Sequence, residues 1–334
     1  MAKKIKDTDY LAISARIKAM ETGLLTRERM EQVLEARSVE DAAKLLQECG
    51  YPELDARDPE AMDAALSAAR EATLSDLADG APDPRYIDIF KLKYDYHNIK
   101  AVLKAKAMNT SPDSMLMDMG RVPAAELQEA VLTGRLDELP ESLAAAAAEA
   151  AEVLDGTRDP QLSDIVLDRW CYQEMNAVAE ETGSAFLAGY VRIQIDAANL
   201  RALVRTIRMG KAGEFLKTVL LEGGDIGTDA IIAAANAGGS GLADVYGPTA
   251  LAAAAEAGAE ALRGGPLTAF EKLCDDAVGD YLAGAQFVPF GEAPLLGYLA
   301  ARETEYTNIR ILLMGRGAGL PADVIRSRLR SSYV

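Results

Sequence analysis

Apolar residues follow helical spacing along most of the chain, and one nine-residue pattern of apolar and polar positions occurs three times. The copies begin at Asp95, Asp196 and Glu305. Each consists of an acid, two variable residues, Asn, an aliphatic residue, a base, an apolar residue and two aliphatic residues. The aliphatic positions fall at i, i+3 and i+4, which is the spacing of one helix face. The pattern therefore predicts three equivalent amphipathic helices.

A second pattern, a glycine turn followed by an amphipathic run, returns with the same period. The turns occupy residues 23–26, 120–123, 224–227 and 319–321. We expect glycine to end the preceding helix and Thr or Pro to begin the next one. A period of about a hundred residues is far longer than the unit of a helical solenoid, so each repeat is a whole bundle of helices.

The repeats predict both the fold class and the domain organisation. We expect an all-α fold with three pseudo-threefold-related helical bundles that form a ring or funnel, with the first and last segments of the chain in contact. The bundles are assigned to residues 1–119, 120–223 and 224–334, and the last includes a closing C-terminal segment. Alanine-rich stretches at 143–152 and 250–261 favour helix. Loops are expected at 81–84, 238–241 and 264–266.

The polar residues of the repeated helix are the candidate contact residues. Asn is a poor helix former because its side chain competes for nearby backbone groups, so its recurrence indicates a specific hydrogen bond. That bond is made either to a neighbouring helix or to a partner protein. The bases that gather on these helices either belong to ordinary solvated faces or meet an acidic or carbonyl-rich partner. The predicted partner-binding residues are Asn98, Asn199, Asn308, Lys100, Lys104, Arg201, Arg205 and Arg310.

The charge of the chain excludes some partners. A formal charge of −17 argues against nucleic-acid binding as the main role. The charge is unevenly spread: residues 111–190 carry sixteen acidic and four basic residues, whereas residues 301–334 carry six arginines and three acids. No apolar run reaches the length of a membrane span and no secretory signal opens the chain, so we expect a cytosolic protein.

The sequence has few residues in the arrangements that catalysis or metal binding needs. The single histidine, His97, cannot form a zinc site alone, and the three cysteines are far apart and fit small buried residues better than ligands. No phosphate-binding loop is present. Asp275, Asp276 and Asp280 resemble the diphosphate-binding run of terpenoid synthases, but their spacing offsets the first two and no second acidic motif faces them. We therefore expect no catalytic site, metal, cofactor or small-molecule substrate.

The assembled motifs resemble one protein family, the C subunits of the bacterial and archaeal V/A-type rotary ATPases, which are similar to the d subunit of the eukaryotic vacuolar enzyme. The N-terminal match consists of Tyr10, Ala15, Arg16, Glu21, Leu24, Leu25, Met30, Leu34, Ala42, Leu45 and Leu46. The C-terminal match consists of residues 294–298, Glu305, Asn308, Ile309, Arg310, Gly315, residues 319–321, Ile325, Arg326, Leu329, Tyr333 and Val334. The chain departs from the family pattern at residues 143–159 and 235–248.

The resemblance implies a non-catalytic rotor subunit. It implies a funnel on the cytoplasmic face of the proteolipid ring, with a cavity that receives the end of the axle, subunits D and F. Rotation would pass through it and couple ATP hydrolysis or synthesis to H⁺ or Na⁺ transport. In this interpretation Lys100, Arg201 and Arg310 face the cavity or its rim; the opposing interpretation is that they pair with acids of their own bundles. The alternative function is a free-standing cytosolic helical adaptor.

Overall fold

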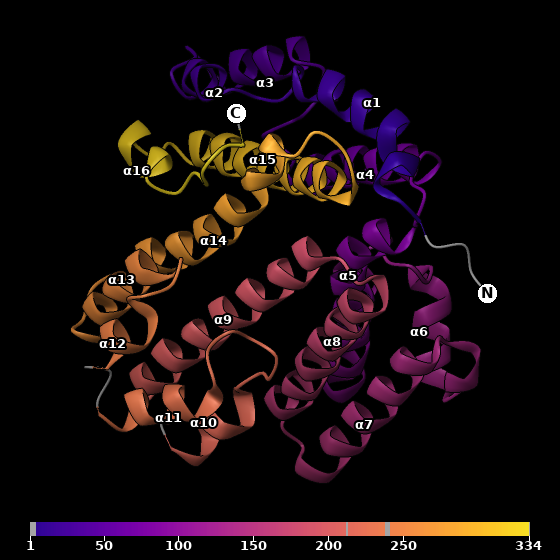
Figure 1. Cartoon of the computed structure of the whole chain (residues 1–334), viewed down its shortest axis with the longest axis vertical. Coiled ribbons are helices and arrows are strands. Elements are labelled where there is room, and N and C mark those ends of the chain that lie inside the picture. The colour runs from indigo at the N-terminus through magenta and orange to yellow at the C-terminus, as the bar shows by residue number, and fades with distance from the viewer. Residues whose placement is uncertain (1–4, 212, 238–240, 334) are drawn as a thin grey trace. The chain divides into compact units, whose positions relative to one another are not determined.

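A computed structural model describes residues 5–211, 213–237 and 241–333 of the chain. The described residues form sixteen α-helices and four short 3₁₀ helices, without a strand among them, which confirms the predicted all-α class (Figure 1). The loops expected at 81–84 and 264–266 join helices as predicted, whereas residues 238–240 of the third expected loop lie outside the described residues. Among the described helices, none is both long and apolar enough to cross a membrane.

The chain packs as two compact units. The described residues of the first unit lie within 1–83, 196–216 and 226–334, and those of the second lie within 84–195 and 217–225. The helices of the first unit are α1 (Leu11–Glu21), α2 (Arg27–Leu34), α3 (Val39–Glu48), α4 (Pro59–Ala78), α11 (Thr228–Asn236), α12 (Leu242–Tyr246), α13 (Ala252–Leu262), α14 (Leu267–Ala283), α15 (Glu292–Gly317) and α16 (Ala322–Arg326). Its 3₁₀ helices are Asp7–Tyr10 and Gly284–Phe287.

The second unit is smaller and contains the first copy of the repeated pattern. Its helices are α5 (Arg85–Met108), α6 (Ala124–Thr133), α7 (Glu141–Thr157) and α8 (Pro160–Thr182), with 3₁₀ helices at Asp113–Met115 and Leu136–Glu138. Two helices, α9 (Ala185–Arg208) and α10 (Glu214–Val219), have residues in both units. The division of the sequence into three repeats, with boundaries at 119/120 and 223/224, remains a prediction.

Each of the four glycine turns precedes a helix, as predicted. The helices α2, α6, α11 and α16 begin one residue after the turns at 23–26, 120–123, 224–227 and 319–321. The expectation that glycine ends the preceding helix is correct for Gly23 and Gly319. It is wrong for Gly120 and Gly224, because α5 already ends at Met108 and α10 at Val219. Gly120 instead allows a close approach between its turn and a carboxylate of α5.

Local sequence explains several helix boundaries. Helices α4 and α8 both begin with Asp followed by Pro: the carboxylate caps a free backbone N–H, and Pro fits the first helical position. Asp58 accepts from Ala61 N at 3.0 Å, and Asp159 accepts from Gln161 N at 2.9 Å. The alanine-rich stretch 143–152 lies within α7, whose buried alanines allow close packing with α8.

The long helix α15 forms the centre of the first unit. It packs against α1, α2, α3 and α4 from the N-terminal part of the chain and against α14 and α16 (Figure 1). Buried residues at this junction include Leu25, Leu46, Tyr306, Ile309 and Ile325. The first and last segments of the chain therefore meet, as the repeat pattern predicted.

The long helix α5 has the same central position in the second unit. It packs against α6, α7 and α8, and its apolar stripe of Ile99, Val102 and Leu103 is buried. The corresponding stripes of the other two copies, on α9 and α15, are buried as well. All three copies of the repeated pattern thus lie on helices of at least 24 residues whose apolar face packs in a core.

Candidate interaction site

The acid of each repeated pattern accepts a backbone N–H from the third residue of a glycine turn. Val122 N donates to Asp95 Oδ1 at 3.2 Å, and Ile226 N donates to Asp196 Oδ1 at 3.1 Å. Leu25 N donates to Glu305 Oε1 in the same way. We call this contact the acid clamp. The two motifs that recur along the chain therefore bind each other, a connection that the sequence patterns did not predict.

In the first copy the clamp belongs to a buried ionic network. Asp95 is fully buried and binds Arg121 Nε at 2.7 Å as well as Arg121 N at 2.9 Å. Arg121 Nη1 in turn donates to Glu174 of α8 at 2.6 Å, and the hydroxyl of Tyr96 donates to the same carboxylate at 2.8 Å. Burial raises the pKa of the Asp95 carboxyl above its usual value, although Arg121 and the backbone N–H groups favour the charged form.

Gly120 is required for the close approach of the turn to Asp95. A Cβ atom on Gly120 would lie only 2.1 Å from Asp95 Oδ1, far inside van der Waals contact. Any other residue would push the turn away and lengthen the hydrogen bonds of the clamp. The glycine that the sequence suggested as a helix terminator instead leaves room for this carboxylate.

In the third copy the clamp joins the C-terminal part of the chain to the N-terminal part. Glu305 on α15 accepts from the Tyr51 hydroxyl at 2.7 Å and from Arg302 Nη1 at 2.7 Å, besides Leu25 N. The Arg302 guanidinium lies 5.1 Å from the ring centre of Tyr51 and 5.0 Å from that of Tyr306, and its Nη2 donates to the Tyr306 hydroxyl at 3.0 Å. Burial raises the pKa of Glu305, against the effect of Arg302.

The repeated asparagines lie inside the protein. Asn98, Asn199 and Asn308 are 0%, 0% and 1% exposed. Asn98 Nδ2 donates to Met117 O at 2.8 Å and its Oδ1 accepts from Met117 N at 2.9 Å. Asn308 makes the same pair of bonds with the backbone of Arg330, at 3.1 and 2.8 Å. The contacts of Asn98 and Asn308 fit the packing interpretation, and contact of the asparagines with a partner remains a prediction.

The repeated bases each face an acid on another helix of their own unit. Lys100 binds Asp168 on α8, Arg201 binds Glu271 and Asp275 on α14, and Arg310 binds Asp63 on α4. Each long helix is therefore paired with the helix that precedes the next long helix, in cyclic order along the chain. The two additional bases follow the same rule: Lys104 binds Asp164 on α8, and Arg205 binds Glu271 on α14.

These ion pairs remain partly open to solvent. The side-chain exposed fractions are 20% for Lys100, 40% for Lys104, 21% for Arg201, 56% for Arg205 and 55% for Arg310. Exposed pairs contribute about 0–1 kcal/mol to stability, because water and salt screen them. A partner carboxylate can therefore share such a base at small cost. Pairing within the unit is observed, and contact with a partner remains a prediction for these five residues.

The enzyme-like aspartates have structural partners. Asp275 binds Arg201 and Arg330, and Asp276 binds Lys272 and accepts from Ser331 N at 2.8 Å. These contacts engage the carboxylates of Asp275 and Asp276 within the protein.

Other candidates for reactive chemistry are also held in structural surroundings. His97 Nε2 lies 2.9 Å from Met115 O on the segment that follows α5. Burial raises the pKa of the Cys171 and Cys274 thiols to about 12, so both stay protonated and unreactive at neutral pH. Cys171 and Cys274 are the small buried residues that the sequence predicted, whereas Cys49 is partly exposed.

Comparison with known proteins gives a consistent result. The family model described as ATP synthase (C/AC39) subunit matches residues 13–328. The C subunit of the V-type sodium ATPase of Enterococcus hirae is 25% identical over 332 residues, covering 97% of this chain and 99% of that protein. The C subunit of the A-type ATP synthase of Methanocaldococcus jannaschii is 25% identical over 346 residues, covering 96% of this chain and 86% of that protein. The corresponding protein of Halobacterium salinarum is 24% identical, with coverage of 96% and 97%.

Proposed function

Because the chain belongs to the ATP synthase (C/AC39) subunit family, we propose that it is the non-catalytic socket of the central stalk in a V/A-type rotary ATPase. It receives the end of the axle, subunits D and F, and rests on the cytoplasmic face of the membrane proteolipid ring. Rotation then passes through it between the catalytic head and the ring. The observation that carries this proposal is the family match over residues 13–328, together with relatives of nearly equal length that bear the name of the C subunit.

The contacts of the long helices support a mechanical role. A body that transmits torque must not yield between its helices, so its elements need fixed contacts. Buried charge networks around Asp95 and Glu305 hold the glycine turns to α5 and α15, and ion pairs hold each long helix to a second helix. Such networks fix geometry because a displaced buried charge is costly. We propose that the units together form the predicted funnel of three pseudo-equivalent bundles.

Co-purification tests the proposed function. The tagged full-length chain is expressed in its own organism, and the membranes are solubilised in a mild detergent before capture. We expect the catalytic head, subunits D and F and the proteolipid to be recovered with it in constant ratio. Recovery of the chain alone, or with cytosolic proteins but without the proteolipid, would instead support the free-standing adaptor.

We expect the repeated bases to contribute to axle binding. Substituting Lys100, Arg201 and Arg310 by glutamine should weaken binding of the D–F axle by about tenfold and reduce its salt dependence, because three charges that steer an acidic partner are lost. Binding is measured with purified axle at several salt concentrations.

The acids of the same ion pairs provide the matched control. Asp63→Asn and Asp168→Asn break the pairs of Arg310 and Lys100, and Glu271→Gln breaks one of the two pairs of Arg201, while all three bases stay in place. This triple variant should bind the axle at least as well as the wild type. If both triple variants weakened axle binding equally, the ion pairs would serve only the fold. The same conclusion would follow if the base substitutions changed neither the affinity for the axle nor its salt dependence.

A further inference from the structure

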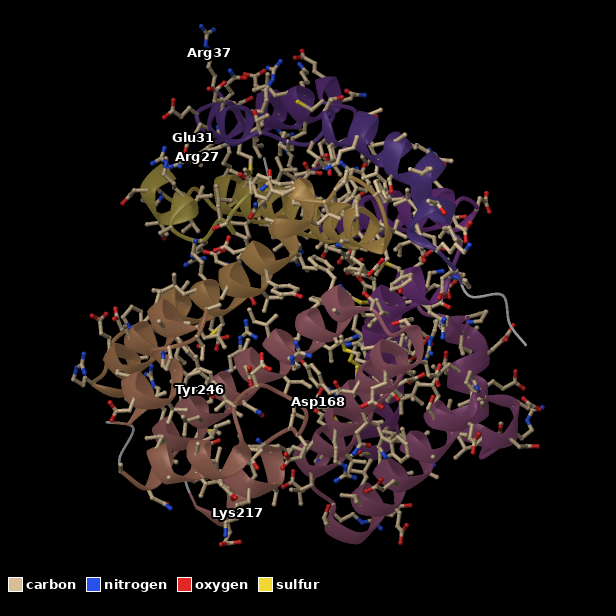
Figure 2. The ribbon with its side chains drawn as sticks, in the orientation of Figure 1. Arg27, Glu31, Arg37, Asp168, Lys217 and Tyr246 are labelled. Atoms are coloured by element: carbon tan, nitrogen blue, oxygen red, sulfur yellow. The ribbon has the colours of Figure 1, made fainter. Side chains whose placement is uncertain are left out.

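A basic pocket of about 380 Å³ lies in the first unit between α2, α14 and the segment that follows α16. The basic and hydroxyl residues that line it are Arg27, Lys272, Arg326, Arg330, Ser331 and Ser332. Met30 and Leu329 add apolar surface, and Glu31 is the one acidic residue of the lining. Figure 2 marks Arg27 and Glu31 on α2, the helix that packs beside α16. Four bases thus gather around one pocket in a chain whose formal charge is −17.

Three of these bases have acidic partners within the unit. Arg326 binds Glu31 and Glu35, Arg330 binds Asp275, and Lys272 binds Asp276. Arg27 differs, because it forms no hydrogen bond or ion pair with any residue that the structure describes. Its guanidinium therefore brings a complete set of unused N–H donors to the pocket.

We propose that this pocket binds an oxyanion of the phosphate type, either a free phosphate or the phosphate of a lipid headgroup. The planar fork of an arginine matches two oxygens of a phosphate, and Arg27 has that fork free. Lys272 and the Ser331 hydroxyl line the same space and supply further donors. Glu31 attracts Arg27 only through space, because the hydrogen bonds of its carboxylate go to Arg326 at 2.9 and 2.8 Å, so the N–H groups of Arg27 stay available.

The pocket is built partly from the C-terminal segment, so binding affects how that segment is held. Three hydrogen bonds hold this segment in place. The Arg330 N–H donates to Asn308, the Ser331 N–H donates to Asp276, and the Tyr333 hydroxyl donates to Glu21. An oxyanion between Arg27 and Ser331 adds a bridge from the segment to α2. We therefore expect saturating inorganic phosphate to slow amide hydrogen exchange at residues 327–333. This site goes beyond the proposed rotor function and does not depend on it.

Titration of the full-length chain with inorganic phosphate at low ionic strength tests the site. The negative charge of the whole chain disfavours non-specific anion binding, so saturable binding reports a local site. Arg27→Gln should weaken it by about tenfold, the usual effect of losing one charge-assisted hydrogen bond. Because Arg27 has no described internal partner, this variant should fold normally, which circular dichroism verifies. Arg29→Gln on the same helix is the control, because Arg29 does not line the pocket.

A second set of measurements identifies the source of the phosphate. Flotation with phosphatidylcholine vesicles, with and without phosphatidylglycerol, tests the lipid headgroup. The site is assigned to a lipid headgroup if the chain binds phosphatidylglycerol vesicles in a way that depends on Arg27 and does not bind inorganic phosphate. Ser331→Ala should weaken binding of the probe that the wild type binds, inorganic phosphate or phosphatidylglycerol, while the hydrogen bond from its backbone N–H to Asp276 remains. Absence of saturable binding to both probes, or equal binding by the Arg27→Gln and Arg29→Gln variants, overturns the proposal.

Discussion

Substituting Glu305 by glutamine is expected to lower the free energy of unfolding of the first unit by about 3–5 kcal/mol, because it leaves the charge of Arg302 buried without its carboxylate. The side-chain exposed fractions of this pair are 18% for Arg302 and 8% for Glu305, so solvent compensates little of the loss. The variant also places an amide N–H₂ among the donors of Leu25, Tyr51 and Arg302, which all require an acceptor. The contact between the first and last segments of the chain weakens as a result.

Urea unfolding followed by circular dichroism measures this loss, and hydrogen exchange locates it. Exchange should accelerate at the start of α2 and around Tyr51. Asp63→Asn is the matched control: it breaks an ion pair of the same long helix, but the pair is about half exposed, so a loss of at most about 1 kcal/mol is expected. A Glu305 variant that is no less stable than the Asp63 variant would contradict the account of the clamp.

Substituting Asp95 by asparagine should destabilise the second unit by about 1–3 kcal/mol, because Arg121 and two backbone N–H groups lose a buried charged acceptor while Arg121 keeps its pair with Glu174. The fluorescence of Trp170, the only tryptophan of the chain, reports unfolding of α8 within this unit. Asp164→Asn provides the control, since the pair with Lys104 is partly exposed and contributes little.

Gly120→Ala tests the same clamp from the side of the turn. The added Cβ conflicts with Asp95 Oδ1 and should destabilise the second unit even though all charges remain. If Asp95→Asn and Gly120→Ala left the Trp170 transition where it is in the wild type, the clamp would not stabilise this unit.

The sequence predicted the helices correctly because their signals are local. Apolar positions at i, i+3 and i+4 lie on helices with buried faces, and Thr26, Pro123 and Pro321 at the ends of three glycine turns directly precede helix starts. The clamp could not be predicted in this way, since it joins residues far apart in the chain. Glu305 and Leu25 are separated by 280 positions, and nothing in either motif specifies the other as its partner.

The arginine that neutralises the acid of the clamp could not be predicted from the sequence for a second reason. In the first copy the cation comes from the turn, as Arg121, whereas in the third copy it comes from the long helix, as Arg302. The same buried charge is thus neutralised from different sequence positions, so no repeated residue marks it. The repeated asparagines differ in this respect, because Asn98 and Asn308 each bind the segment that follows their own helix, 19 and 22 positions further along the chain.

The most direct test of the central claim is to observe whether this chain rotates. The complex is fixed to a surface through its catalytic head, and a bead is attached to an exposed cysteine introduced into this chain. We predict that the bead turns in one direction when ATP is supplied and stops when hydrolysis is inhibited. Beads attached to the axle of the same complexes are the control. If those beads turned during ATP hydrolysis while a bead on this chain remained stationary, the assignment of this chain to the rotor would be contradicted.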